Sequence, residues 1–236
     1  MHIADKQSGF LQGFIAGAVL LAGTGQILAN FVGTTSGTFV NPVGPSTMVT
    51  TGVGTSAFTW GVGQPAPPSS LNIAGVSFDT PGETLFKVGT LTYYNGTITS
   101  GTGADSVSMD VLFNFTDPAG VDRTFIYALS LINTPNTGTA EQQADIVSMS
   151  SVPNQTFTVG STTYTIHLSF ANFSASSFGG PNEFRVFENA RATADLEGLI
   201  TSDLTGTGVP DAGSTMPLLG AALASVAGLR RRIAKA

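Results

Sequence analysis

Residues 107–131 read VSMDVLFNFTDPAGVDRTFIYALSL, and this stretch decides the fold class. Apolar and polar residues alternate on both sides of the turn-forming segment Asp117-Pro118-Ala119-Gly120. Such alternation gives a strand one face for the core and one for solvent, so we predict a long antiparallel hairpin. Its apolar face comprises Val107, Met109, Val111, Phe113 and Phe115 in the first arm and Phe125, Tyr127, Leu129 and Leu131 in the second.

The two-residue alternation of apolar and polar side chains continues on either side of the hairpin. No segment between 31 and 208 has the three- and four-residue apolar spacing of a helix. Eight to eleven short strands with Gly- and Pro-rich turns are expected, which predicts an all-β domain over residues 30–208. Its expected architecture is an antiparallel β-sandwich, with the jelly roll as one form of it. The further strands expected are Ser56–Trp60, Ser70–Phe78, Phe86–Tyr94, Thr156–Thr158, Tyr164–Phe170, Phe184–Phe187 and Ala192–Ile200, with a turn at 179–182.

The composition excludes several classes of protein. Of the 236 residues only 10% are charged, and none is cysteine, which excludes disulfide scaffolds, thiolate metal sites and cysteine nucleophiles. Between Asn30 and Gly208 there are four basic and thirteen acidic residues, a net charge of −9. That balance leaves no basic surface for nucleic acid, so we expect no nucleic-acid partner.

Residues 1–29 have the organisation of a secretory signal peptide. Lys6 precedes the mostly apolar run Phe10–Ala22, and the small residue Ala29 ends the polar stretch that follows. This order of regions predicts export and cleavage after Ala29. The alternative is an N-terminal helix that is buried against the domain.

Residues 209–236 combine a short motif, an apolar segment and a basic cluster. The motif is Val209, Pro210, Asp211, Ala212 and Gly213, the apolar segment is Met216–Leu229, and the basic cluster is Arg230, Arg231 and Arg232. As a helix the apolar segment would rise about 21 Å, less than the roughly 30 Å hydrocarbon core of a bilayer. This length favours a transient membrane segment over a permanent one.

The order of these three elements resembles the PEP-CTERM class of sorting signals in its VPDSG variant, with Ala212 where the variant's name has serine. The resemblance implies an exosortase-type enzyme as partner, cleavage near Val209-Pro210 and removal of the tail. Before processing, the C-terminal helix would hold the chain in the membrane, with the arginines on the cytoplasmic side. An ordinary tail anchor is the alternative.

Several separated blocks between about residues 50 and 200 resemble the choice-of-anchor K domain. Such domains occur on bacterial surface proteins whose C-terminal anchoring signals vary, so the resemblance implies a surface location and no particular activity. The blocks are Phe58–Gly63, Pro65–Leu71, Phe86–Thr97, Leu131–Asn136 and Ala144–Val147.

Few residues have the pattern of a catalytic site. His167 is the sole histidine after the leader, so neither a zinc site nor a Ser-His-Asp triad with a nucleophile elbow is expected. Carboxylate pairs such as Asp195 with Glu197, or Glu183 with Glu188, could serve a glycosidase, but they occupy the solvent positions of strands. We therefore predict that the protein is not an enzyme.

Two ligand hypotheses remain, each beside a structural alternative. Asn133, Asn136, Glu141 and Asp145 place four side-chain oxygen donors within thirteen residues, a pattern that suits a weak calcium site, although the asparagines could simply cap turns. The sole tryptophan, Trp60, is either an exposed platform on which a sugar stacks or a plug in the core. No other cofactor is expected.

Together these patterns predict an exported, C-terminally processed cell-surface or extracellular-matrix protein with a non-catalytic β-sandwich. The predicted location is the cell envelope, the cell surface or the medium. The alternative function is a secreted carbohydrate- or calcium-binding module, whose partner would be an extracellular polysaccharide or the cation.

Overall fold

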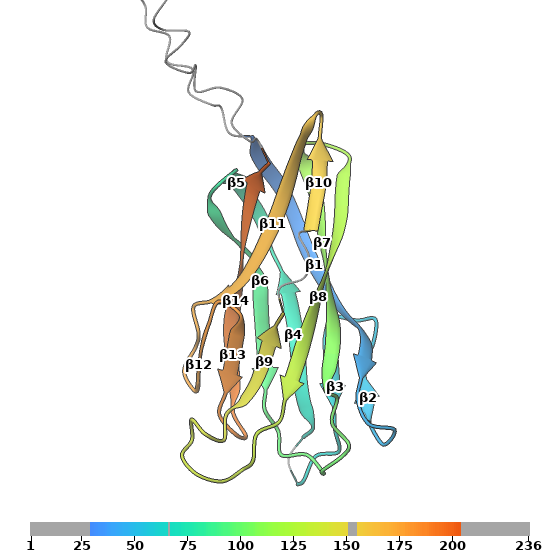
Figure 1. Ribbon diagram of the computed structural model, residues 1–236, viewed down its shortest axis with the longest axis vertical. Coiled ribbons are helices and arrows are strands. Elements are labelled where there is room, and N and C mark those ends of the chain that lie inside the picture. The colour runs from blue at the N-terminus through green and yellow to red at the C-terminus, as the bar shows by residue number, and fades with distance from the viewer. Residues whose placement is uncertain (1–28, 66, 151–154, 204–236) are drawn as a thin grey trace, which may run out of the picture.

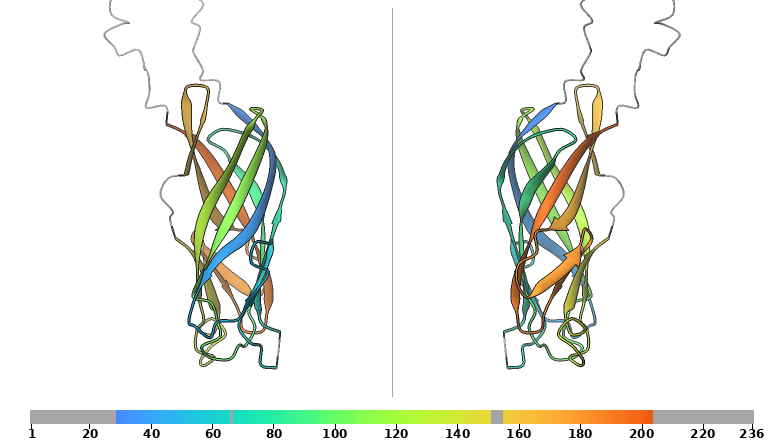
Figure 2. Two further views of the ribbon diagram at one scale, coloured as in Figure 1. Left: turned by 90° about the vertical axis from the view of Figure 1, so that its right-hand side faces the viewer. Right: turned by 90° about the vertical axis from the view of Figure 1, so that its left-hand side faces the viewer.

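The computed structural model describes residues 29–65, 67–150 and 155–203. These residues form fourteen strands and no helix, arranged as two seven-stranded antiparallel sheets. The sheets curl and pack face to face along the long axis of the molecule (Figures 1 and 2). The predicted all-β antiparallel sandwich is thus confirmed. The two expected terminal helices lie outside the described residues, among which no helix could cross a membrane.

The two sheets differ in strand order from edge to edge. One sheet contains, in this order, β12 (Ser177–Gly180), β13 (Glu183–Val186), β9 (Asp145–Met149), β8 (Val121–Ile132), β7 (Ser106–Asp117), β1 (Asn30–Val43) and β5 (Ser77–Pro81). The other contains β10 (Gln155–Val159), β11 (Thr162–Ala171), β14 (Arg191–Ser202), β6 (Leu85–Tyr94), β4 (Ser69–Gly75), β3 (Ala57–Trp60) and β2 (Thr50–Thr51).

The predicted hairpin over 107–131 is confirmed as β7 and β8. The two strands pair in register from Ser106 opposite Ser130 to Phe115 opposite Val121. All nine residues predicted for its apolar face are buried in the core. Gly120 adopts a positive φ of 76° in the connecting turn, a conformation that glycine adopts without steric cost.

The structure has more strands than the sequence predicted. The long first strand β1 was not expected, because glycine and threonine occupy inward positions at Gly33, Thr35 and Gly37 and so hide the alternation. The single strand expected at Ser70–Phe78 is two strands, since the chain crosses from one sheet to the other at Val76.

Aromatic side chains fill the space between the sheets. Near one end, Phe31 makes edge-to-face contacts with Phe115 and Tyr164, at centroid distances of 5.9 and 5.1 Å. Near the other end, Phe58 and Tyr93 stack on Trp60. Such pairs add to the stabilisation from apolar burial, so this core can hold the domain without a disulfide.

Hydrogen bonds join the two sheets along both of their edges. On one side Thr35 of β1 donates through Oγ1 to the carbonyl oxygen of Val88 in β6, and it accepts a bond of 3.0 Å from the backbone nitrogen of Val76. On the other side the Gln155 side-chain amide donates to the carbonyl oxygen of Ile126 in β8 at 2.8 Å. The sandwich is therefore closed along its sides by polar contacts as well as by its core.

We expect Thr35→Val to lower the free energy of unfolding by about 1–3 kcal/mol, because it keeps the shape of the side chain but leaves the buried carbonyl oxygen of Val88 and the partly buried nitrogen of Val76 without this partner. Thr34→Val is the matched control: Thr34 is exposed and makes no side-chain hydrogen bond within the described residues, so its effect should stay within about 0.5 kcal/mol. Urea denaturation of both variants measures the difference. Equal effects would contradict the proposed role of Thr35.

Candidate functional site

Both described ends of the chain lie at one end of the sandwich, which we call the terminal end (Figure 1). The turn between β5 and β6 ties them together. The backbone nitrogen of Gly82 donates to the carbonyl oxygen of Ala29 at 2.8 Å, and that of Glu83 donates to Ile200 at 2.8 Å. The Glu83 carboxylate also accepts a bond of 2.9 Å from the backbone nitrogen of Ser202. The predicted signal cleavage site, Ala29, and the chain leading to the predicted sorting signal are thus neighbours.

The opposite end, which we call the loop end, is formed by the connections 44–49, 95–105, 133–144 and 187–190 (Figures 1 and 2). A hollow of about 420 Å³ opens there. Ile98 and Leu131 supply apolar wall, while Asp105 and Asn133 supply polar groups. A hollow of this size with mixed lining is of the kind that holds small ligands.

Trp60 does not present a face to this hollow. It is only 4% exposed, and its ring is stacked between Phe58 at 5.6 Å and Tyr93 at 5.7 Å. Of the two alternatives considered for Trp60, this burial contradicts the exposed sugar-stacking platform and agrees with the plug in the core, since Trp60 shares the inward side of β3 with Phe58. Trp60 nevertheless lies in the lining of the hollow.

The four residues predicted to bind calcium are only partly brought together. Asp145 accepts hydrogen bonds from the backbone nitrogen of Thr134 at 2.7 Å and from its hydroxyl at 3.1 Å, which places the carboxylate beside Asn133. Asn136 instead donates to Glu188 at 2.9 Å. Glu141 is exposed and interacts with its own loop, so it stands apart from the others.

Glu188 is the residue of this cluster that the calcium prediction missed. It lies in the connection between β13 and β14 and also accepts a hydrogen bond from Thr97, so only the fold brings it to Asn136. No local spacing in the sequence could have linked it to the 133–145 segment. Within the described ranges, no three Asp, Glu or His side chains are grouped as a metal site.

Asp145 carries a strongly perturbed carboxyl group. Burial, and to a smaller extent the charge of Glu188, raises its pKa to about 6 against the opposing effect of the hydrogen bonds from Thr134. Burial, followed by the charges of Asp145 and Glu188, also raises the pKa of Tyr93 well above its usual value. Two carboxylates therefore share a partly buried environment at the loop end.

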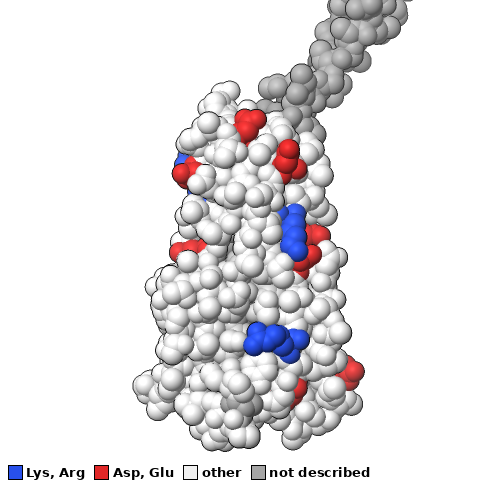
Figure 3. All heavy atoms as spheres, turned by 180° about the vertical axis from the view of Figure 1, so that it is seen from behind, with Lys and Arg blue, Asp and Glu red and all other residues white. Residues whose placement is uncertain are grey.

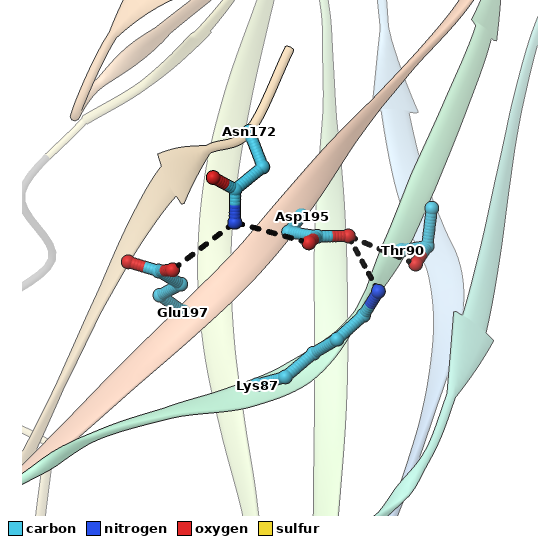
Figure 4. Close-up of polar contacts among 5 residues, drawn as sticks. All are labelled: Lys87, Thr90, Asn172, Asp195 and Glu197. Carbon is cyan, nitrogen blue, oxygen red and sulfur yellow. Dashed lines mark hydrogen bonds and ion pairs between the residues drawn. The ribbon is translucent and has the colours of Figure 1, made fainter. Parts of the chain in front are cut away.

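The pair Asp195 and Glu197, considered from the sequence as glycosidase carboxylates, forms a surface network (Figure 4). Asp195 contacts Lys87 at 2.6 Å and accepts bonds of 3.2 Å each from Thr90 and Asn172. Asn172 also donates to Glu197 at 3.4 Å. Burial raises the pKa of Asp195, but these hydrogen bonds and the Lys87 charge outweigh it and leave the pKa lowered. A lowered pKa does not suit the acid of a glycosidase, so this geometry favours a structural role.

Basic side chains are scattered over the face seen in Figure 3 and do not form a continuous basic surface. Among the described residues, Lys87 pairs with Asp195 and Arg185 with Glu183. Arg191 lies over the ring of Tyr94. This distribution gives no track for a nucleic-acid backbone.

Comparison with known families identifies the C-terminal signal. Residues 208–233 match the VPDSG-CTERM motif. The match supports a sorting signal recognised by an exosortase-type enzyme, and it indicates export, C-terminal processing and a cell-envelope or surface location. The matched residues lie outside the part of the chain that the structure describes. No curated protein matches the chain, and the resemblance to the choice-of-anchor K domain stays a prediction.

We expect Lys87→Met to lower the free energy of unfolding by less than about 1 kcal/mol, because the pair is at the surface and Asp195 keeps its bonds to Thr90 and Asn172. Folding lowers the pKa of Asp195 from 3.8, so its ionised carboxylate stabilises the folded state. This stabilisation is present above pH 3.8 and is lost as the pH falls through the lowered pKa of the folded protein. The difference from the parent should therefore shrink in acid.

Arg123→Met is the control, because Arg123 bonds only to the carbonyl oxygen of Asp122 within the described residues. Chemical denaturation at neutral pH and near pH 3 measures the free energy of unfolding of the parent, Lys87→Met and Arg123→Met. A loss for Lys87→Met that does not change with pH would contradict the ion pair.

Proposed function

We propose that this chain is an exported cell-surface protein whose C-terminal signal is cut by an exosortase-type enzyme, leaving a non-catalytic β-sandwich displayed outside the cell. The observation that carries the proposal is the VPDSG-CTERM match at residues 208–233, directly after the last strand of the domain. We also propose that the loop end of the domain points away from the membrane while the tail is being processed.

Chain length supports this orientation. Asp203 is the last described residue, and five residues separate it from Val209 of the motif. Even fully extended, so short a connection spans only about 20 Å. While the tail is in the membrane, the terminal end must therefore lie close to the bilayer surface, and the loop end is the part of the domain that extends furthest from it.

The charge of the domain fits the same orientation. The region between Asn30 and Gly208 carries a net charge of −9. An anionic lipid surface repels such a domain, which keeps it solvated and held only through its tail.

A second function, as a secreted module that binds polysaccharide, is favoured by one observation. The hollow at the loop end combines apolar walls with Asp105, Asn133 and Thr99, the mixture that a sugar requires. Trp60 would add little surface to such a site, because it is only 4% exposed.

The tail test uses tags on both sides of Val209 and fractionation of cells and medium. Replacing Arg230, Arg231 and Arg232 with glutamine should release uncut protein into the medium, because each arginine costs about 2.5–3.5 kcal/mol to move to the centre of a membrane and the parent tail is held by all three. Pro210→Ala should leave the protein uncut in the membrane, since the apolar helix is kept and the recognition motif is lost.

Ala212→Ser is the matched control, because it restores the residue in the motif's name and should be processed at least as well as the parent. If the arginine and proline variants are both cut and localised like the parent, the tail is a passive apolar helix and the sorting proposal fails.

A further inference from the structure

A row of neighbouring side chains crosses the outward face of four strands near the loop end (Figure 1). We call it the outer row, and each member pairs with the next across the sheet: Ile132 in β8, Ile146 in β9, Arg185 in β13 and Phe178 in β12. Val147 and Phe184, which adjoin members of the row in sequence, are buried in the core. Because side chains alternate between the two faces of a sheet, the outer row points away from the core.

The outer row combines apolar surface with hydrogen-bond donors. Ile132 is 47% exposed. The guanidinium group of Arg185 lies over the ring of Phe178, 5.7 Å from its centroid, and Phe187 contacts the same ring at 5.8 Å. Within the described residues, Arg185 donates only through Nη2, to Glu183 at 2.6 Å, so its other N–H groups remain available to a ligand.

Small polar side chains lie beside the outer row on the same face. Ser130 of β8 pairs with Ser148 of β9, which pairs with Glu183 of β13. Within the described ranges the hydroxyls of these two serines form no hydrogen bond, unlike that of Ser150, which donates to a carbonyl oxygen. A sugar ring has C–H groups on its faces and hydroxyls around its edge, so it can contact the apolar row and the polar residues together.

The outer row begins at the hollow of the loop end. Ile132 lines this hollow of about 420 Å³ together with Asn133 and Asp105. Neighbouring strands lie about 4.8 Å apart, so four residues in a row extend over roughly 14 Å. The row and the hollow together are therefore longer than a single sugar ring and can contact several consecutive rings of a chain.

The charges of this surface favour a neutral chain. Arg185 and Glu183 pair with each other, so the outer row and the polar residues beside it carry no net charge. The hollow contributes the carboxylate of Asp105, which forms no ion pair within the described residues, and the region between Asn30 and Gly208 has a net charge of −9. This charge repels an anionic polymer and leaves a neutral one unopposed.

We propose that the hollow and the outer row together bind a neutral polysaccharide as an extended chain that runs across the strands. One ring lies in the hollow, and the following rings lie over Ile132, Ile146 and Phe178. This inference rests on the second function proposed above, polysaccharide binding, and adds to it the class of chain and the residues that it contacts. In the proposed orientation the loop end points away from the membrane, where such a chain is accessible.

Binding is measured by passing the full chain, held in lipid nanodiscs, over polysaccharides fixed to a sensor surface. The neutral probes are a β-glucan, a galactomannan and dextran, and the anionic probe is alginate. We expect at least one neutral polymer to bind and alginate not to bind. Oligosaccharides cut from the bound polymer should compete more strongly as they lengthen, and the monosaccharide should compete poorly, because it contacts only part of the surface.

Two variants and a matched control locate the chain. Phe178→Ala should weaken binding about fivefold or more, because it removes the ring at the far end of the row. Ile132→Ser should weaken binding about threefold or more, because it removes apolar surface where the row meets the hollow. Ile126→Ser is the control: Ile126 is 50% exposed on the same face of β8 but lies outside the row, so this variant should bind like the parent. The thermal transition shows that each variant is folded.

Two results would overturn the proposal while leaving polysaccharide binding in place. They are binding by Phe178→Ala and Ile132→Ser equal to that of the parent, and binding of alginate alone. Binding of none of the four polymers would overturn polysaccharide binding as well. If the parent then associates with a second copy of the chain and Phe178→Ala does not, the outer row is an interface between copies.

Discussion

The packing of aromatic and aliphatic side chains between the two sheets is the interaction on which the rest of the domain depends. With no cysteine and few charges, the chain has no other strong means of holding its sheets together. Aromatic contacts connect the two layers at both ends: Phe31 with Tyr164 at the terminal end, and Phe39 with Phe58 and Tyr93 with Phe184 towards the loop end. The hydrogen bonds of Thr35 and Gln155 then close the sides, where a strand edge would otherwise be open.

This packing also fixes where the chain enters and leaves the domain. The first and last strands belong to different sheets, and the turn at Gly82 and Glu83 binds both of them at the terminal end. A tail attached there, five residues from the sorting motif, leaves the connections of the opposite end free to meet the surroundings. The hydrogen-bonded cluster around Asp145 and the neighbouring hollow both lie at that end.

Much of the fold could be predicted from the sequence, and the errors have physical causes. The β7–β8 hairpin was predicted correctly because its inward positions are all large and apolar, whereas β1 was missed because Gly33 and Thr35 occupy inward positions. The site was harder to predict, since Glu188 reaches the 133–145 segment only through sheet pairing and Trp60 could be assigned to the core only once its neighbours were known. The N-terminal and C-terminal signals could be predicted because each is encoded in one continuous stretch of sequence. The match at residues 208–233 supports the C-terminal signal.

The most direct measurement is the intact mass of the protein recovered from the outside of the native cells. C-terminal processing at the sorting motif predicts a mass that lacks residues 216–236, and signal cleavage predicts that residues 1–29 are missing as well. A mass that still includes residues 216–236 would contradict processing and leave the tail as an ordinary membrane anchor.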